Sequence, residues 1–320
     1  MIRYEIKCPV CRQAFTAIAC SGANSDAGVD RDLFARAGGP QREYYLIATC
    51  PKCGYSGYET DFAPSVAIPA DVRDRILKHP KLALPKGFTP ASDPLDLDAA
   101  ERYELAITCY RWRQRSDEAL AWLHLRAAWI QRDEGSALPP DRGLVRVMEF
   151  AQMWRPKPTS EENQADVQMQ LATRIAEAIA SGRFTRYQRP YVDLTLAMLL
   201  RRHGENRQAA PVLDALIESN PFPTALQDAI RRMRDSVDRE RKHQIAAAEC
   251  FERALLANQI IGTNRPPACY LLGELNRRIG RDREAVRWYD QALESPGIDE
   301  PLKAWAEQQR AWAAEGEVEN

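Results

Sequence analysis

Two pairs of cysteines near the amino terminus have the residue type and the spacing to bind a metal ion. Each pair has the pattern Cys-x-x-Cys, and the four residues are Cys8, Cys11, Cys50 and Cys53. Zinc takes four ligands in a tetrahedron, with thiolate sulfur at about 2.3 Å. One such turn places two thiolates on one side of the ion, so two facing turns complete the site. The sequence therefore predicts one Zn²⁺ per chain, and a structural one, because four cysteines leave no open position for water or substrate.

Other interpretations of these cysteines are a redox dithiol or isolated buried thiols. A dithiol of the thioredoxin type is a single Cys-x-x-Cys near a βαβ pattern, and the sequence lacks that pattern. Cys20 is a rival ligand, but it has no second cysteine at this spacing, and we expect it to lie in a loop. Cys109, Cys250 and Cys269 fall on predicted helices, where we expect small buried hydrophobic residues.

Short β segments flank the cysteine pairs and are expected to position them. Tyr4–Lys7, Ala14–Ala19 and Glu43–Thr49 are rich in β-branched and aromatic residues. Residues 20–42 are rich in Gly, Ala, Ser and Asp and are expected to form a loop. Gly54 follows the second pair, where a left-handed residue lets backbone N–H groups point at sulfur. Residues 1–62 are therefore predicted to form a small β zinc ribbon with a long inserted loop.

Residues 63–97 are predicted to form a linker with one short helix near Ala70–Lys78. Six prolines in this segment forbid a long helix. They are Pro64, Pro69, Pro80, Pro85, Pro90 and Pro94.

From residue 98 to residue 320 the apolar residues recur at helical spacing, and two stretches repeat. Residues 194–204 and 270–280 both end in Arg-Arg-x-Gly, and each is followed by a predicted second helix, at 206–217 and 282–293. Paired helices of this kind resemble the tetratricopeptide repeat (TPR), whose period is about 34 residues. The predicted fold class is mostly α, with a small β zinc ribbon followed by a TPR-like helical-hairpin domain. The alternative is an irregular α-bundle.

In a TPR unit the first helix of each pair lines a concave groove, and this predicts a partner-binding surface. The groove positions are Arg201, Arg202, Tyr270, Glu274, Arg277 and Arg278. A row of guanidinium groups suits a carboxylate or an acidic peptide. The alternative is that arginine in the last turn of a helix only interacts with the helix dipole, worth about 0.3–1 kcal/mol.

The chain lacks the motifs of the common catalytic sites, so we expect no catalytic residues. Neither a phosphate-binding G-x-x-x-x-G-K-[ST] nor H-E-x-x-H occurs. The net charge is −1, and the first 65 residues carry seven Lys/Arg and seven Asp/Glu. This balance opposes nucleic-acid binding, which requires clustered positive charge. Acidic residues also interleave with the basic run at 231–242, which predicts a solvated helix face with i,i+4 pairs.

No targeting segment is evident in the sequence. The first residues lack the apolar core of a signal peptide. The apolar run Leu194–Leu200 is too short to cross a bilayer. We expect a cytoplasmic protein that does not bind membranes.

At five places the chain resembles the bacterial DUF2225 family, a domain of unknown function. They are Cys8–Cys11, the pair Arg31-Asp32, Cys50–Tyr55, the helical stretch Glu101–Trp129, and the repeat at Tyr270–Leu293. The resemblance implies a zinc-ribbon-like start followed by TPR-like helices. It implies no activity, and this sequence departs from the family in its Gly/Ala-rich loop at 20–40 and in Cys20.

The sequence favours a non-enzymatic adaptor that contacts a protein or peptide partner through its helical surface. One alternative is a nucleic-acid-associated zinc-ribbon protein. Another is a metal-dependent or thiol enzyme that uses Cys20, for which no base or orienting partner is evident.

Overall fold

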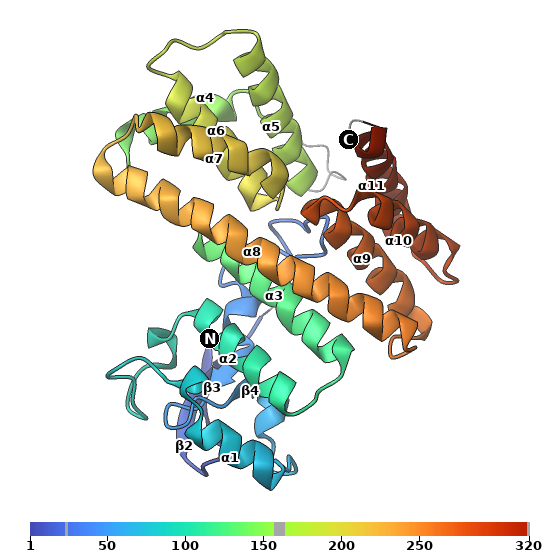
Figure 1. Ribbon diagram of the computed structural model, residues 1–320. Coiled ribbons are helices and arrows are strands. Elements are labelled where there is room, and N and C mark those ends of the chain that lie inside the picture. The colour runs from blue at the N-terminus through green and yellow to red at the C-terminus, as the bar shows by residue number, and fades with distance from the viewer. Residues whose placement is uncertain (23–24, 157–163, 319–320) are drawn as a thin grey trace. The chain divides into compact units, whose positions relative to one another are not determined.

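The computed structural model describes residues 1–22, 25–156 and 164–318 (Figure 1). Residues 23–24 of the predicted loop, and 157–163 and 319–320 of the predicted helical domain, lie outside the described residues. The described chain forms four strands and eleven α-helices, which confirms a mostly α fold with a small β start.

The chain divides into two compact units, each assembled from segments that are separated in the sequence. Unit 1 contains the described residues of 1–24, 37–130 and 246–261. Unit 2 contains the described residues of 25–36, 131–245 and 262–320. Two long helices, α3 (Asp117–Glu134) and α8 (Thr224–Leu256), contribute residues to both units.

Two antiparallel hairpins form the β part of unit 1. Strand β1 (Ile2–Lys7) pairs with β2 (Ala14–Ala19), with Ile2 opposite Ala19 and Lys7 opposite Ala14. Strand β3 (Ile47–Thr49) pairs with β4 (Ser56–Tyr58). The first two segments were predicted. The third is shorter than predicted, because residues 42–45 form a 3-10 turn, and β4 is too short to give a sequence signal.

The proline-rich segment at 63–97 takes part in the core of unit 1. It contains the predicted helix, α1 (Ala70–Lys78), which buries Val72 and Ile76. These side chains share one hydrophobic cluster with Cys8 and Cys50 and with residues of α2 (Ala99–Trp112). The predicted domain boundaries at residues 62 and 97 stay predictions.

Unit 2 consists of helices and the short segment 25–36. In addition to parts of α3 and α8, its helices are α4 (Arg142–Gln152), α5 (Gln164–Ala180), α6 (Arg189–Arg202), α7 (Asn206–Ser219), α9 (Arg265–Ile279), α10 (Asp282–Glu294) and α11 (Glu300–Val318). No helix in the described parts of the chain has the length and apolar character needed to span a bilayer.

The two repeated stretches form consecutive helix pairs, α6 with α7 and α9 with α10. Close packing of the second pair depends on Gly273, because a Cβ there would lie 2.7 Å from the ring of Tyr289. Ala285 and Ala292 on α10 are fully buried. Small residues therefore let these two helices approach each other closely.

Candidate metal centre

The four predicted cysteines meet in one cluster in unit 1. Their sulfur atoms all lie within 4.8 Å of one another. The Sγ atoms of Cys8 and Cys53 are 3.7 Å apart, and those of Cys11 and Cys50 are 3.5 Å apart. Each of these contacts joins one pair to the other. The cluster could hold a metal ion.

Each cysteine pair lies at the tip of a hairpin. The first cysteine of each pair closes the turn through its backbone N–H: Cys8 donates to the carbonyl of Gln13 at 2.9 Å, and Cys50 donates to that of Tyr55 at 2.8 Å. The strands that precede and follow each turn fix its direction, so both pairs present their thiols to the same point.

The fourth residue after the first cysteine has a left-handed backbone in both turns. These residues are Arg12, with φ 63°, and Gly54, with φ 71°. Their N–H groups donate to the carbonyls of Cys8 at 3.0 Å and Cys50 at 2.9 Å. Only the second turn requires glycine, because a Cβ at Gly54 would lie 2.5 Å from the carbonyl oxygen of Leu82. The sequence predicted Gly54. The left-handed backbone of Arg12 was not predicted, because arginine, unlike glycine, is not typical of that conformation; its side chain is exposed.

The cluster lies against a small hydrophobic core. Cys8 and Cys50 are fully buried, and Cys11 and Cys53 are half-buried. The ring of Phe62 packs edge-on against the Tyr55 ring, with centroids 5.2 Å apart. Hydrogen bonds from the thiols of Cys53 and Cys8 lower the pKa of the Cys50 thiol. The hydrogen bond to Cys50 in turn raises the pKa of the Cys8 and Cys53 thiols, so Cys50 is the cysteine of this group that ionises most readily.

A buried carboxylate joins the second hairpin to α2. The carboxylate of Asp61 accepts hydrogen bonds from the Tyr110 hydroxyl at 2.5 Å and from Arg113 at 2.7 Å. The Arg113 guanidinium also donates to the hydroxyl of Tyr55, the residue that closes the second turn, at 2.6 Å. This support could not be predicted from the sequence, because its members are about 50 positions apart.

Cys20 does not belong to the cluster. Its thiol donates to the carbonyl of Gly22 at 3.2 Å, and the metal-binding group found among the described residues contains only the four predicted cysteines. Cys109, Cys250 and Cys269 are buried, as expected.

Comparison with protein families identifies a match over most of the chain. The model described as "Uncharacterized protein conserved in bacteria (DUF2225)" matches residues 1–238 and 234–313. The chain belongs to the DUF2225 family. The matched region includes both cysteine pairs and both repeated helix pairs, and it confirms the resemblance seen in the sequence. Neither the curated proteins nor the solved structures contain a significant match.

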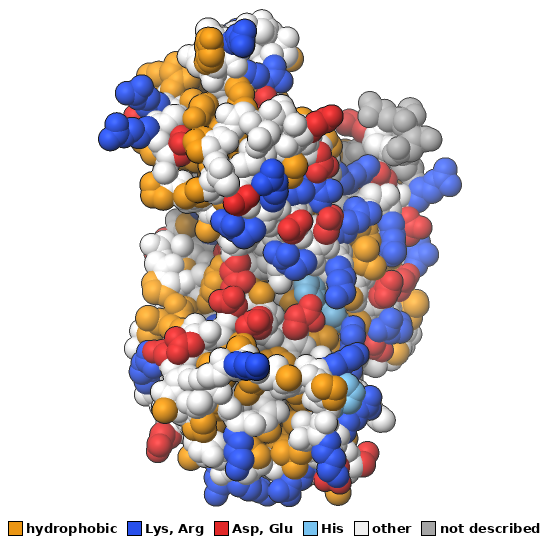
Figure 2. Space-filling view, turned by 60° about the vertical axis from the view of Figure 1, so that its left-hand side comes forward, with side chains coloured by type: hydrophobic (Ala, Val, Ile, Leu, Met, Phe, Trp, Pro, Cys, Tyr) orange, Lys and Arg blue, Asp and Glu red, His pale blue; other side chains and the backbone are white. Residues whose placement is uncertain are grey.

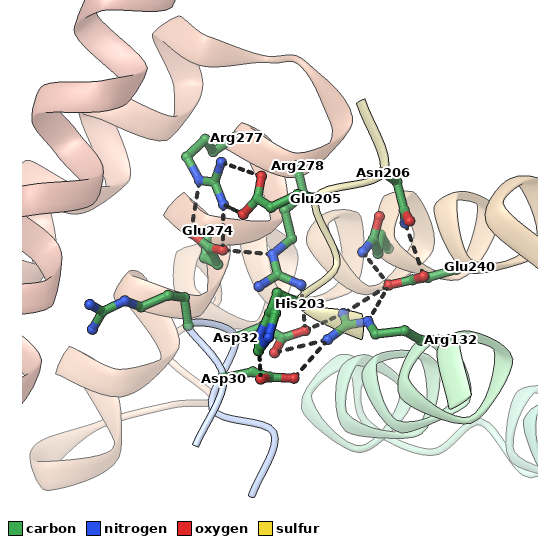
Figure 3. A network of polar contacts seen from close by, with 12 residues as sticks. Asp30, Asp32, Arg132, His203, Glu205, Asn206, Glu240, Glu274, Arg277 and Arg278 are labelled. Atoms are coloured by element: carbon green, nitrogen blue, oxygen red, sulfur yellow. Dashed lines mark hydrogen bonds and ion pairs between the residues drawn. The ribbon is translucent and has the colours of Figure 1, made fainter. Parts of the chain in front are cut away.

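The six predicted groove residues of this DUF2225 chain lie in unit 2, and four of them belong to an ion-pair network, of which Figure 3 shows a large part. We define the network by five carboxylates and five guanidinium groups. They are Asp30, Asp32, Glu205, Glu240, Glu274, Arg36, Arg132, Arg201, Arg277 and Arg278.

The repeat arginine of α6 faces the interior of unit 2. Arg201 is fully buried and forms an ion pair with Glu240 of α8. It also donates to the carbonyl of Gln131 at 3.0 Å and to the side chain of Asn206 at 3.0 Å.

The repeat residues of α9 are held in the same way. Glu274 is fully buried and accepts from Arg278 at 2.6 Å and from the Tyr289 hydroxyl at 2.7 Å. Arg277 bridges Glu274 at 2.9 Å and Glu205 at 2.7 Å. The hydroxyl of Tyr270, also fully buried, donates to the carbonyl of Arg31 at 2.7 Å.

Of the six predicted partner-binding residues, only Arg202 is exposed. Arg277 is half-buried, and the remaining four are buried. Partner contact by these residues stays a prediction. The geometry shows that five of them are engaged within unit 2.

Two aspartates from segment 25–36 complete the network. Asp32 accepts from Arg132 at 2.5 Å and from Arg278 at 2.9 Å. Asp30 accepts from Arg36 at 2.7 Å and from Arg132 at 3.3 Å. The segment between the two cysteine pairs is thus bound by ion pairs to α3 and α9. In the sequence, this segment was singled out only by the Arg31-Asp32 pair of the family resemblance, and the ion-pair partners of Asp32 were not predicted.

The charges of the network set the protonation of its carboxylates. Burial by itself raises the pKa of Glu240, but the neighbouring Arg132 and Arg201 outweigh burial and lower that pKa to about 2. Burial opposes ionisation of Glu274 as well, and Arg277 and Arg278 lower its pKa. These carboxylates stay ionised inside the protein because cations face them.

Proposed function

We propose that the four cysteines bind one structural Zn²⁺ and that the chain is a non-enzymatic adaptor for a protein or peptide partner. A tetrahedral site with zinc–sulfur distances of about 2.3 Å has sulfur atoms about 3.8 Å apart. The two Sγ–Sγ distances between the cysteine pairs, 3.7 and 3.5 Å, fit this value. Four soft thiolates in a tetrahedron suit zinc or iron.

The cysteine cluster is the observation that carries the proposal. Four thiolates fill the coordination of zinc, so the ion would hold the two hairpins together and would have no position for a substrate. Thiolates persist in reducing compartments, which supports a cytoplasmic location.

The helix pairs support the adaptor role. Stacked antiparallel helix pairs of the TPR type expose an extended surface on which peptides and protein segments bind. Here α6 with α7 and α9 with α10 have the predicted spacing, and Gly273 provides the close approach of the second pair.

The alternative, a nucleic-acid-associated ribbon protein, gains no support. Phosphate contacts require Lys and Arg to gather on one surface. On the face drawn in Figure 2, basic and acidic side chains are interspersed.

Metal analysis of the purified full chain tests the zinc proposal. We expect one zinc per chain, lost in Cys50→Ser and kept in Cys20→Ser, because only the first residue contributes a ligand. Iron at the same stoichiometry, or a folded chain without metal, would contradict it.

Cross-linking in the native host tests the adaptor role. We expect the full chain to co-purify with a protein in a defined ratio that nuclease treatment does not change. Association that disappears with nuclease would instead favour the nucleic-acid alternative.

A further inference from the structure

Unit 2 contains a cavity of about 250 Å³ that shares only Arg36 with the ion-pair network. Most of its wall is apolar. Met148 and Ala151 of α4, Leu171 of α5, and Met198 and Leu199 of α6 line it. This volume lies near the lower end for small-ligand sites, so it suits one large side chain and not an extended cofactor.

Positive charge is in excess at the polar part of the wall. Arg36, Arg202 and Asp133 line it, which gives two cations and one anion, a net charge of +1. Arg36 is neutralised, because it contacts Asp133 at 2.9 Å and Asp30 at 2.7 Å. No ion pair joins Arg202 to any residue in the described part of the chain.

Arg202 therefore places a guanidinium group that belongs to no ion pair in the described part of the chain at the edge of an apolar cavity. Burial and the neighbouring Arg36 lower the pKa of Arg202, and the carboxylates of Asp30 and Asp133 offset only part of this effect. An anion bound here would remove this electrostatic cost, and a carboxylate matches the planar guanidinium through two parallel hydrogen bonds.

The apolar wall continues onto the surface of α4. Val145, Met148 and Phe150 are 49%, 39% and 42% exposed. Figure 2 shows hydrophobic side chains at the surface of the upper part of the view, which α4–α7 form in Figure 1. Methionine has three rotatable bonds and adapts to different apolar shapes, which is why Met-rich surfaces bind varied peptides.

We propose that this cavity binds the carboxyl-terminal residue of a polypeptide partner, with its apolar side chain against Met148 and Met198 and its carboxylate on Arg202. A terminal residue carries both groups on one Cα, so it places an anion next to an apolar side chain in the smallest volume. The proposal rests on the adaptor function and specifies which part of the partner is recognised.

Fluorescence anisotropy with the full chain tests this proposal. The probe is the labelled peptide Ser-Gly-Ser-Gly-Phe-Leu with a free carboxylate, and the control probe is the same peptide with a carboxyl-terminal amide. We expect the free carboxylate to bind about tenfold more tightly or better, since a hydrogen bond to a charged group has that magnitude. Arg202→Gln should remove the difference between the two probes.

Two further variants make the test specific to the cavity. Arg232→Gln changes another exposed arginine, on α8, and should bind like the unchanged chain. Met148→Glu adds a carboxylate beside Arg202 at a position that is 39% exposed, so it should fold and yet lose binding of the free-carboxylate peptide.

Equal binding of the two probes, full binding by Arg202→Gln, or no binding of either peptide would overturn the proposal. Hexanoate that binds as tightly as the peptide would also overturn it, because the ligand would then be a free acid. None of these results changes the zinc content or the cross-linking result, so failure of the cavity proposal is distinguishable from failure of the adaptor function.

Discussion

Gly204 lies in the turn between α6 and α7, where the backbone comes close to two guanidinium groups. This residue has φ 76°, and a Cβ there would overlap Arg278 and would lie 2.7 Å from Arg132. Both arginines are buried members of the ion-pair network. Glycine is required here for two reasons, its backbone conformation and the space that the network occupies.

Gly204→Ala should therefore destabilise unit 2 far more than the backbone conformation alone explains. The matched control is Gly182→Ala, because Gly182 has a similar φ of 68° but nothing within 4 Å of the added Cβ. The control should lose about 1–2 kcal/mol from left-handed strain. Gly204→Ala should lose about 3 kcal/mol or more beyond that, the cost of disturbing buried ion pairs. Calorimetric unfolding of both variants measures the difference, and equal losses would contradict this role of the network.

Helix α8 shows how one element combines a solvated face with a buried charge. The predicted exposed pairs are present, for example Arg234 with Asp238 at 2.8 Å. On the opposite face, Met233, Ser236 and Glu240 are fully buried. The run of charges at 231–242 thus forms a solvated face, as predicted. The exception is Glu240, whose burial the sequence does not reveal.

Removing the charge of Glu240 should be costly, because Arg132 and Arg201 would lose the carboxylate between them. We expect Glu240→Gln to lower the free energy of unfolding by about 3–5 kcal/mol, the range for breaking a buried ion pair. Asp238→Asn, on the exposed face of the same helix, should cost about 0.5 kcal/mol or less. Thermal unfolding of the two variants gives the comparison. Similar midpoints would show that Glu240 does not stabilise the packing of α8.

At the scale of the whole molecule, acid should weaken unit 2 through its ionised carboxylates. The pKa values of Asp30, Glu205, Glu240 and Glu274 are all lower in the folded chain than their ordinary values. A depressed carboxyl pKa contributes stability that is present above the unfolded pKa, about 4.3 for Glu, and is lost as pH falls through the folded pKa.

Comparing the unchanged chain with Glu240→Gln at each pH separates the effect of this carboxylate from any loss of metal, because both proteins contain the same cysteines. The difference in unfolding midpoint between the unchanged chain and Glu240→Gln should be constant from pH 7 to about pH 5.5. It should shrink as pH falls from about 4.5 toward the Glu240 pKa of about 2. A difference that stays the same at pH 3 would mean that Glu240 is not the ionised partner of Arg132 and Arg201.

The arrangement of unit 1 also bears on where the chain can be divided. Leu105 and Cys109 of α2 share a core with Cys8, Phe62 and Leu82. A chain that starts at Asp96 lacks the last three of these residues and would expose one face of α2.

We therefore expect a chain truncated at Asp96 to expose apolar surface and to lose the helicity of α2, contrary to independent folding of residues 98–320. Dye binding and circular dichroism would show both changes. A truncated chain that keeps its full helicity and unfolds cooperatively would instead support the division predicted at residue 97.

The sequence by itself determined the features that depend on local spacing. The Cys-x-x-Cys pattern identified the four cysteines of the cluster, since three-residue spacing within a turn is a local property. Helical periodicity and the repeated Arg-Arg-x-Gly ends located α6, α7, α9 and α10 for the same reason. The short strand β4 and the left-handed backbone of Arg12 were not predicted, because neither produces a recognisable pattern in the local sequence.

Only the tertiary structure decided which charges are buried and what they contact. Asp32 and Arg278 form an ion pair although they are 246 positions apart, and no periodicity connects them. The arginines of the repeats looked like a binding row because their spacing places them on one helix face. Whether that face meets solvent or carboxylates depends on which segments pack against it. Burying a charge is favourable only when a partner from another segment is already in place, so long-range packing assigned Arg201, Arg277 and Arg278 to the interior and left Arg202 at the surface.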